Sequence, residues 1–511
     1  MKDANFYITT PIYYPSGEPH MGHAYSSIIA DVFARFKRND NCKVFFLTGT
    51  DEHGLKIQNA AKKAGLDPLI YCDKISKVFR ELTKKLNLSN DDFIRTTEKR
   101  HYDSVNNLWN RLIKSGDIYL SKYKGWYSVS DEAYYNSDEI AEKNGKKIST
   151  FSGSSVEWVE EDSFFFKLSA WEKKLLEFYE KNDKFILPSS RRNEVIKFVK
   201  SGLKDLSVSR TSFTWGIMVP NNNKHVIYVW LDALTNYLSA LNYPNVNDKL
   251  YKDFWPASLH VIGKDILRFH AIYWPAFLLA ADIPPPKRVF GHGWILSGDE
   301  KMSKSKGNIL NPIEIINTYG IDQLRYYLIK EVSLGTDGNI SLKNLESCIN
   351  SDLANNYGNL CQRVFSFIKN NCESKVNKTK NITDSDKKLL NQTEALTKDI
   401  RNEMNNQDLN NYMRSVINIC FLTNKYINDE EPWKLKKNNI KKMNNILHIA
   451  LEQIAKISIL FNPIIPNATS KVLDALNIKP ELRNLSFLDG SNIFTNEIKI
   501  NELDILFKKI T

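Results

Sequence analysis

The chain has 511 residues, of which 42% are hydrophobic and 25% charged, a composition typical of a globular protein with more than one domain. Its formal net charge of +11 favours polyanionic partners such as nucleic acids, although a lysine-rich surface that only maintains solubility explains the charge equally well. The six cysteines include no CxxC pair, which excludes a disulfide framework and a thiolate zinc site.

The chain carries no recognisable targeting or membrane segment. Its N-terminus runs directly into an apolar strand pattern, without the apolar stretch and cleavage site of a secretory signal. The longest apolar run, around residues 271–281, is short and broken by Pro275, so it cannot cross a bilayer. We therefore expect a cytoplasmic protein with reduced thiols and no membrane contact.

Strand and helix patterns alternate in the first part of the chain. Phe6–Thr9 is predicted as a buried strand, and apolar residues recur at helical spacing from Ala24 onward. Lys43–Thr48 is predicted as a second strand, ending in a Gly-Thr-Asp turn, and Phe93–Thr96 as a third. This order predicts an α/β fold with a doubly wound, Rossmann-like parallel sheet, whose ligands lie beyond the carboxyl ends of the strands.

The pattern changes twice further along the chain. Between about Ile118 and Val226 aromatic and acidic residues crowd together, which indicates an inserted α+β module. The strand–helix pattern resumes at Leu259–Ile262 and near Arg288–Gly291, and after about Leu345 the sequence is almost purely helical. We therefore predict two halves of a catalytic domain at 1–117 and 226–292, an insert at 118–225, a loop and stem-contact region at 293–345, and an α-helical domain at 346–511.

Three loops carry residues suited to a triphosphate. His20-Met21-Gly22-His23 follows the first predicted strand, Gly49–Gly54 follows the second, and Lys301–Ser305 lies in a glycine-flanked loop. Imidazole N–H groups and a helix N-terminus can bind phosphate oxygens, and mobile lysines can neutralise a leaving pyrophosphate. A carboxylate that attacks ATP needs no general base, so alignment and charge neutralisation are the chemistry that such a site must supply.

The pairing of HxGH with KMSKS, roughly 280 residues later, resembles the signature of class I aminoacyl-tRNA synthetases. The blocks TTPIYYPSGEPHMGH, TGTDEHG, YVWLDALTNY, HVIGKDILRFH and EEPWKL resemble the methionyl family of these enzymes. The resemblance implies a ligase that activates L-methionine with ATP, releases pyrophosphate and charges the 3′-terminal adenosine of tRNA(Met). Magnesium is implied by the ATP chemistry.

The resemblance also assigns site residues. The catalytic set comprises His20, Gly22, His23, Lys301 and Lys304, and the ATP-binding set comprises His20, His23, Lys264, Asp265, Gly291, His292, Gly293, Lys301 and Lys304. Asp51 is expected to bind the amino group of methionine. The methionine side chain is expected to contact Ile12, Tyr14, Trp230, Ala233, Tyr237, Ile266, His270 and Trp274. Aromatic walls suit a polarizable thioether, although any one of these aromatics could equally be a core residue. The role of Asp232, in the same block, stays open.

Three residues of the helical region match the anticodon-reading residues of the family. Asn359 and Arg363 are four apart and share one helix face, and Trp433 follows Pro432 at a predicted loop-to-helix junction. Stacking on an aromatic ring and hydrogen bonds to base edges suit the CAU anticodon of the family's tRNA. Without the resemblance, Trp433 would be interpreted as a core residue of a helix pair.

The sequence departs from the family pattern in its insert. Many members hold zinc with paired CxxC knuckles, but Ser128 and Asp131 stand at the two ligand positions here and no second pair precedes Phe164. We therefore predict no zinc, and an insert held by packing of Trp126, Tyr134, Tyr135, Trp158 and Phe164. The insert is too short for an editing domain, and a chain that stops where the family's core ends indicates a monomer.

The sequence is also compatible with other functional interpretations. A cysteinyl or leucyl synthetase would share the signature pair, although the cysteinyl enzyme uses zinc ligands that are missing here. A catalytically silent tRNA-binding paralogue would be expected to lack a signature histidine or lysine. A small cytidylyltransferase-like enzyme shares the HxGH turn but would lack the helical third.

Overall fold

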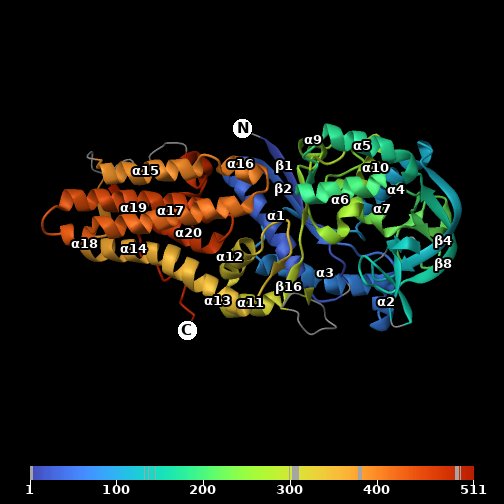
Figure 1. Cartoon of the computed structure of the whole chain (residues 1–511), viewed down its shortest axis with the longest axis horizontal. Helices are drawn as coiled ribbons and strands as arrows, with labels where there is room; N and C mark the ends of the chain where they lie inside the picture. Colours follow the sequence, from blue (N-terminus) through green and yellow to red (C-terminus); the bar gives the residue numbers. More distant parts are fainter. Residues whose placement is uncertain are drawn as a thin grey trace. The chain divides into compact units, whose positions relative to one another are not determined.

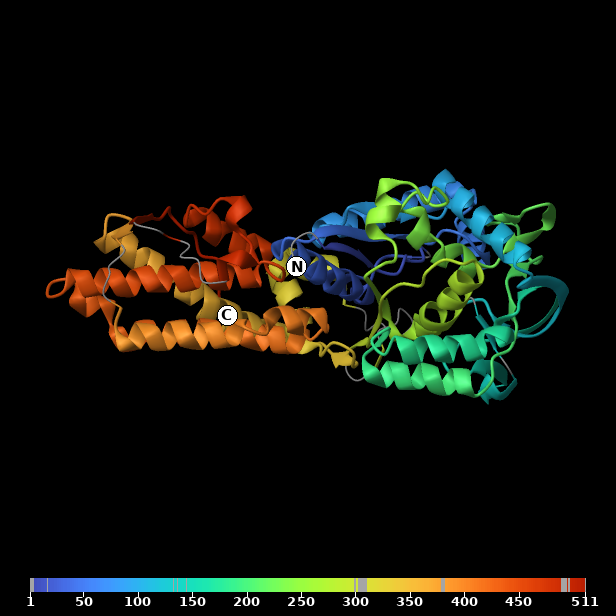
Figure 2. The same cartoon turned by 90° about the horizontal axis from the view of Figure 1, so that it is seen from above.

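The computed structural model describes residues 4–15, 17–131, 133–135, 137–143, 145–297, 300–301, 310–377, 382–488, 494 and 497–510. The chain folds into two compact units, shown in Figures 1 and 2. The sheet unit comprises residues 5–30 and 45–292, and the helical unit comprises residues 31–44 and 293–511 together with the first four residues. Among the described residues, none of the helices combines the length and the apolar character that a membrane crossing requires.

A central parallel sheet organises the sheet unit. Its described strands lie in the order β3 (Asp92–Arg95), β2 (Lys43–Thr50), β1 (Asn5–Thr9), β14 (Leu259–Gly263), β15 (Val289–His292) and β9 (Ile186–Leu187). The pairs β2–β3, β1–β14, β14–β15 and β15–β9 are parallel. The predicted doubly wound α/β fold is thereby confirmed. The final strand, β9, comes from the inserted segment and was not predicted.

The strand order reverses between β1 and β14. The chain proceeds outward from β1 to β2 and β3, and later returns on the other side of β1 through β14 and β15. Tyr7 and Ile8 in β1 and Phe46 and Leu47 in β2 are fully buried, as expected of strands covered on both faces. A reversal of this kind opens a crevice at the carboxyl ends of the strands, which is where open α/β sheets bind ligands.

Helices connect the first strands as the apolar periodicity predicts. They are α1 (Met21–Asn39), α2 (Leu55–Lys63), α3 (Pro68–Lys85) and α4 (Lys99–Lys114). The helix predicted from Ala24 begins three residues earlier, so His23 lies in its first turn. Asp67 caps α3 by accepting hydrogen bonds from the backbone N–H groups of Leu69 and Ile70, with Pro68 at the first helical position.

The inserted segment is built on a long antiparallel ribbon. Strands β4 (Ile118–Ser128) and β8 (Glu157–Phe166) pair along ten residues and extend into a sheet with β5 (Ala133–Tyr135) and β10 (Leu206–Ser207). A hairpin of β6 (Ile140–Lys143) and β7 (Lys146–Ser149) follows β5, and helices α5 (Glu172–Lys181) and α6 (Ser189–Lys200) follow β8. Trp126 meets Trp158 edge to face, but Trp158 is half exposed, so the predicted aromatic packing is only partly enclosed.

Short helices return the chain to the central sheet. Strands β11 (Ser209–Arg210), β12 (Met218–Val219) and β13 (Asn222–Ile227) precede α7 (Val229–Leu234), α8 (Asn236–Ser239) and α9 (Lys249–Phe254). After β14 come a 3₁₀ turn, η3 (Lys264–Ile266), a π-helical turn, η4 (Phe269–Tyr273), and α10 (Trp274–Ala280). Pro275 lies where α10 continues directly from η4, so it has no N–H to donate back along the helix, and the carbonyl of Ala271 four residues earlier accepts the Tyr179 hydroxyl instead.

The helical unit confirms the helical C-terminal region predicted from sequence. Two short strands, β16 (Ile295–Ser297) and β17 (Glu300–Lys301), pair at its start, and β18 (Gly338–Asn339) joins β16. Its helices are α11 (Pro312–Tyr319), α12 (Ile321–Glu331), α13 (Leu342–Cys348), the π-helical η6 (Ile349–Gly358), α14 (Asn359–Asn371), α15 (Asp384–Thr397), α16 (Ile400–Asn405), α17 (Leu409–Glu430), α18 (Pro432–Leu435), α19 (Ile440–Phe461) and α20 (Pro466–Ala475). In both views α17 and α19 run side by side (Figures 1 and 2).

A buried ion pair joins distant segments of the helical unit. The fully buried guanidinium of Arg325 lies 2.7 Å from the Asp31 carboxylate and donates to the carbonyls of Pro463 and Ile464. Asp322, one turn earlier on α12, accepts the backbone N–H of Ala468 at the start of α20 at 2.7 Å. Because each buried charge here has hydrogen-bond partners, the helices are fixed in one arrangement without an isolated buried charge.

Candidate active site and nucleic-acid interface

The two histidines of the HxGH turn form a stacked pair after β1. Their rings lie 3.7 Å apart with an interplanar angle of 24°. The Nδ1 atom of His20 accepts the backbone N–H of Gly22, and the Nδ1 atom of His23 accepts the backbone N–H of His20, each at 3.1 Å. A neutral ring that accepts at Nδ1 must carry its proton on Nε2. Both histidines are therefore fixed in the tautomer that donates from Nε2, the form that suits a phosphate oxygen.

Gly22 allows this arrangement for a steric reason. A Cβ atom at this position would lie 3.0 Å from both Cε1 and Nδ1 of His20. A side chain would therefore push the His20 ring away from the backbone N–H that fixes its tautomer. The glycine of the HxGH turn is required by the histidine packing itself.

The TGTDEHG segment after β2 is held rigidly beside the first loop. The backbone N–H of Asp51 donates to the carbonyl of Tyr13 at 3.0 Å, and Asp51 itself is buried. The next residue, Glu52, accepts two hydrogen bonds from Arg95, at 2.7 and 2.9 Å, and another from the hydroxyl of Thr97. Bidentate, charge-assisted bonds of this kind restrict both side chains. The anchored glutamate therefore holds the backbone of this segment in place.

A tyrosine–histidine pair lies deep in the sheet unit. The Tyr237 hydroxyl is 2.8 Å from Nε2 of His270, and Nδ1 of His270 is 3.0 Å from the carbonyl of Ile266. Burial lowers the pKa of His270 to about 4, so the ring is neutral at physiological pH. Its one N–H must point to the carbonyl, and Nε2 then accepts the Tyr237 proton. A thioether at this pair would meet uncharged polar groups.

Aromatic residues adjoin this pair, since Trp274 lies near the Tyr237 ring and Phe269 precedes His270 in the chain. The rings of Trp230 and Phe269 are parallel at 3.6 Å, and Trp274 is fully buried 6.2 Å from the Tyr237 ring. The structure places the predicted pocket residues Ile12, Tyr14 and Ile266 against the same hydrophobic cluster that contains Trp230, Tyr237 and Trp274, and Ala233 is buried on α7. Phe269 was not predicted. It could have been found from its position in the block that contains Ile266 and His270.

His260 and Asp51 are two further groups near the Tyr237–His270 pair. The buried His260 stacks on Tyr237 at 4.1 Å and bonds through Nδ1 to the hydroxyl of Thr9. Burial, together with the nearby His270, lowers the pKa of His260 well below its usual value. Burial raises the pKa of Tyr237, and the charge of the nearby Asp51 adds to this effect. The predicted amino-group ligand therefore lies within electrostatic reach of the predicted side-chain pocket.

Asp232 lies at the centre of a buried hydrogen-bond network. Its two carboxylate oxygens accept from Nδ1 of His53 at 2.7 Å and from Nε2 of His101 at 2.6 Å. Burial opposes ionisation of this carboxyl group, but the two imidazole donors outweigh it and lower the pKa of Asp232 to about 2. Asp232 is therefore a carboxylate at physiological pH.

The predicted adenylate contacts follow β14 and β15. Lys264 and Asp265 form the 3₁₀ turn directly after β14, and Nε2 of His292 is 2.7 Å from the hydroxyl of Ser26 on α1. Gly291 lies in β15, where it pairs with Ile262 of β14. Gly293 belongs to the helical unit, where an added Cβ would lie 2.0 Å from the carbonyl oxygen of Thr336. The space at Gly293 is thus occupied by backbone, and glycine is required there for chain packing.

The predicted lysines of the KMSKS loop lie largely outside the described residues. The backbone of Lys301 ends β17, but its side chain lies outside the described residues, as does Lys304 within residues 302–309. The sequence-predicted convergence of these lysines with His20 and His23 stays a prediction.

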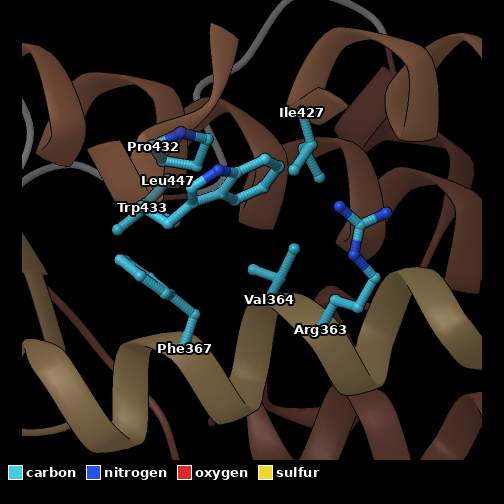
Figure 3. Close-up of a pocket in the computed structure, with 7 residues that line it drawn as sticks. All are labelled: Arg363, Val364, Phe367, Ile427, Pro432, Trp433 and Leu447. Carbon is cyan, nitrogen blue, oxygen red and sulfur yellow. The ribbon is translucent and has the colours of Figure 1, made fainter. Parts of the chain in front are cut away.

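Two of the three predicted anticodon residues line one pocket of the helical unit. The pocket has a volume of about 310 Å³ and is lined by Arg363, Val364, Phe367, Ile427, Pro432, Trp433 and Leu447 (Figure 3). The Arg363 guanidinium lies 5.6 Å from the Trp433 ring centroid and donates to the Asn428 side chain at 2.7 Å. Trp433 is 42% exposed, and Asn359 is exposed one turn before Arg363 on α14.

A tight turn sets the position of Trp433. Glu431, between α17 and α18, has φ 44° and ψ 56°, a left-handed conformation that is rare for a residue with a side chain. Pro432 begins α18 directly after this residue, and Trp433 follows at the pocket wall. The junction at Pro432 therefore joins two helices through one residue, and the loop predicted before it is absent.

Comparisons with known proteins show the family to which the chain is related. Residues 6–365 match the family described as tRNA synthetases class I (M), and residues 376–511 match the anticodon binding domain of methionyl tRNA ligase. The methionine--tRNA ligase of Brucella suis is 47% identical, covering 95% of this chain and 94% of the relative, and that of Rickettsia typhi is 48% identical, covering 99% of each. The structure of Mycobacterium tuberculosis methionyl-tRNA synthetase in complex with methionyl-adenylate superposes with a TM-score of 0.96 at 42% identity, covering 99% of this chain and 100% of that one.

Proposed function

The chain belongs to the methionyl-tRNA synthetase family of class I synthetases, and on this basis we propose that it activates L-methionine with ATP and charges tRNA(Met). The observation that carries the proposal is the assembly at the β1/β14 crevice. There the stacked Nε2 donors of the HxGH turn, the buried Asp51 and the neutral Tyr237–His270 pair belong to one unit. A relative with methionyl-adenylate bound has the same fold over the whole chain.

Activation requires alignment rather than acid–base chemistry. An oxygen of the methionine carboxylate forms a bond to the α-phosphorus of ATP, and the bond to the bridging oxygen breaks, so that its electron pair leaves with pyrophosphate. His20 and His23 donate hydrogen bonds to the phosphates at the start of α1, where the helix dipole favours negative charge. Lys301 and Lys304 are assigned to the departing pyrophosphate. Magnesium bound to ATP would supply further charge neutralisation.

Adenylate binding is assigned to the ends of β14 and β15. Lys264 and Asp265 follow β14, and Gly291 and His292 end β15, with Gly293 next in the chain. In the second step the terminal ribose hydroxyl of the tRNA attacks the methionyl carbonyl. The new ester bond forms as the bond to the phosphate breaks and AMP leaves.

Methionine recognition is assigned to one charge and an aromatic enclosure. The Asp51 carboxylate binds the substrate ammonium group, and the side chain extends toward Tyr237 and His270, with Trp230 and Trp274 as walls. Soft, polarizable contacts with aromatic rings suit the thioether. The neutral state of His270 supports this assignment, because contact between an apolar side chain and a charged imidazole would be unfavourable.

Anticodon binding is assigned to Asn359, Arg363 and Trp433. An exposed indole offers a stacking surface for an unpaired base, and the guanidinium and amide offer hydrogen bonds to base edges. We assign the CAU anticodon of tRNA(Met) to this pocket. The predicted domain boundaries, a monomeric state and a cytoplasmic location belong to the same proposal.

A zinc-free insert is also part of the proposal. Asp131 stands at a knuckle ligand position and accepts hydrogen bonds from the hydroxyls of Tyr135, Ser152 and Ser154, at 2.8, 2.5 and 2.7 Å. Across the described part of the chain, no three His, Cys, Asp or Glu side chains gather as a metal site. Elemental analysis of the purified protein is expected to find far less than one zinc per chain, and stoichiometric zinc would overturn this assignment.

The function is tested by ATP–pyrophosphate exchange with each of the twenty amino acids in turn. We expect exchange with methionine alone above background, followed by charging of tRNA(Met) transcripts. Exchange driven by cysteine or leucine would reassign the enzyme within class I. Tight tRNA binding without exchange for any amino acid would identify a non-catalytic paralogue.

A further inference from the structure

The proposed function gives no role to Asp232, a buried carboxylate beside the predicted methionine pocket that bonds to two histidines. It lies on α7 between Trp230 and Ala233, and its side chain is fully buried. Both of its oxygens accept an imidazole N–H within 2.7 Å. A buried charge is costly to desolvate, and the two charge-assisted bonds that offset this cost tie the carboxylate to other parts of the fold.

The two histidines come from different parts of the sheet unit. His53 lies two residues after Asp51 in the loop that follows β2, and its other nitrogen, Nε2, is 3.2 Å from the Tyr102 hydroxyl. His101 lies on α4, and its Nδ1 is 3.0 Å from the hydroxyl of Ser239 on α8. The carboxylate therefore joins the Asp51 loop, α4 and the α7–α8 segment at one point.

This junction connects the two sides of the predicted pocket. On one side, Asp51 is fixed by its backbone bond to Tyr13. On the other, Trp230 lies two residues before Asp232, on a helix of only six residues whose N-terminus has no side-chain cap. A helix this short has little stability of its own, so its orientation depends on tertiary bonds.

We propose that Asp232, acting through His53 and His101, is a positioning residue that fixes the spacing between Asp51 and Trp230 and thereby sets both the affinity for methionine and the length of side chain that the pocket accepts. The inference rests on the proposed function, because it assigns the amino group of the substrate to Asp51 and its side chain to Trp230. It concerns geometry alone, since Asp232 is expected to contact neither substrate.

The conservative substitution Asp232→Asn separates this role from packing. Asparagine has the same shape, but it offers one acceptor oxygen and one NH₂ donor. It can accept from only one imidazole and presents its NH₂ group to the N–H of the other. That ring must then move its proton to its other nitrogen, which disturbs its bond to Tyr102 or Ser239, or turn away, because the site is buried and water cannot replace the lost bond.

The test is methionine-dependent ATP–pyrophosphate exchange by the full-length Asp232→Asn variant. We expect the KM for methionine to rise at least about tenfold, because small displacements of a substrate-positioning group have large effects. The KM for ATP should stay within about twofold of the parent value, since the ATP contacts are untouched. The kcat/KM ratio of ethionine, the S-ethyl analogue, to methionine should increase, because a loosened spacing admits a longer side chain.

Asp322→Asn is the matched control. Asp322 is also a buried aspartate, but it caps α20 in the helical unit through the N–H of Ala468. The Asp322→Asn substitution is expected to lower the melting temperature while leaving the KM for methionine and the ethionine-to-methionine ratio of kcat/KM unchanged. The inference is overturned if Asp232→Asn retains the parent KM and ethionine ratio, or if the KM values for methionine and ATP rise together.

Should Asp232→Asn fail to fold, His101→Asn decides the question by the same criteria, because it removes only the bond from α4 and leaves His53 in place. A rise in the KM for methionine, smaller than that of Asp232→Asn, with the KM for ATP unchanged supports the inference. A KM for methionine equal to the parent value, or KM values for methionine and ATP that rise together, overturns it. Failure of the proposed function is distinguishable, because the parent enzyme would then show no methionine-dependent exchange.

Discussion

The predicted amino-acid pocket and the predicted anticodon pocket are built on opposite principles. In the sheet unit, the polar groups are buried and bond to one another, as the pair Tyr237–His270 and the network around Asp232 show. In the helical unit, Trp433 is 42% exposed, and Arg363 bonds to an exposed asparagine. One site is closed and organised before its ligand arrives, whereas the other presents its binding groups to solvent.

The contrast fits the proposed ligands. A small molecule offers few contacts, so its site must enclose it and fix each polar group in advance. An RNA loop brings a large surface and strong electrostatic attraction, so a few exposed anchors suffice to capture it. Substitutions in the closed site should therefore act on methionine alone, and those in the open site on tRNA alone.

The largest effect is expected from Asp51→Asn. Removal of the buried charge leaves the substrate ammonium group without its partner, so kcat/KM for methionine in the exchange assay should fall by about 10³. Binding of tRNA(Met), measured by filter retention, should stay within about twofold. A parallel loss of tRNA affinity would show that the two sites are not independent.

Trp433→Ala is expected to lower kcat/KM for tRNA charging by about 100-fold, because stacking of an unpaired base on the indole is lost. Methionine-dependent exchange should remain nearly unchanged. Phe421→Ala, which removes another exposed aromatic ring of the helical unit, should leave both activities intact. Equal loss of exchange and charging would identify Trp433 as a structural residue instead.

Tyr237→Phe should raise the KM for methionine by about five- to tenfold, because it leaves the buried Nε2 of His270 without a donor. Charging at saturating methionine should approach the parent rate. An unchanged KM would mean that the hydroxyl contributes nothing to the enclosure, and the contrast with the open pocket would then rest on apolar packing alone.

The last expected effect concerns stability rather than binding, namely the response of the closed pocket to pH. His270 has a folded-state pKa of about 4, below its usual 6.5, so between these values the unfolded chain binds more protons than the folded one. The free energy of unfolding should therefore rise with pH across this window, by on the order of 3 kcal/mol for this group, and level off above it. Urea unfolding of the parent and of His270→Gln at several pH values measures the difference. A step in the parent's methionine KM near pH 6.5 that is absent in His270→Gln would contradict the burial of this ring.

The fold was largely predictable because its signals are local. The strand predicted at Lys43–Thr48 runs to Thr50, and the helix predicted from Ala24 begins at Met21, small differences at element ends where periodicity is weakest. Strand β9 was not predicted, because two residues carry no periodicity.

The site was predictable only as far as its motifs extend. The HxGH turn and the Trp433 junction lie within short blocks that can be identified in sequence. The partners of Asp232 lie 179 and 131 residues away in the chain, and Glu52 and Arg95 are 43 residues apart. No local pattern records such pairs, because folding alone brings them together. The roles of Asp232 and Glu52 therefore became visible only in the structure.

Under the proposed anticodon role of Trp433, the left-handed turn at Glu431 has a consequence for how fast RNA is captured. Holding a residue other than glycine at φ 44° costs on the order of 1 kcal/mol, and the folded protein has already met that cost before any RNA arrives. The tryptophan that follows is thus presented without a loop that must first become ordered, which removes an entropic barrier from the encounter. Glu431→Gly would relieve the strain but would also make the backbone between α17 and α18 more flexible. Its effect should therefore appear in the association rate rather than in the set of contacts made at the end.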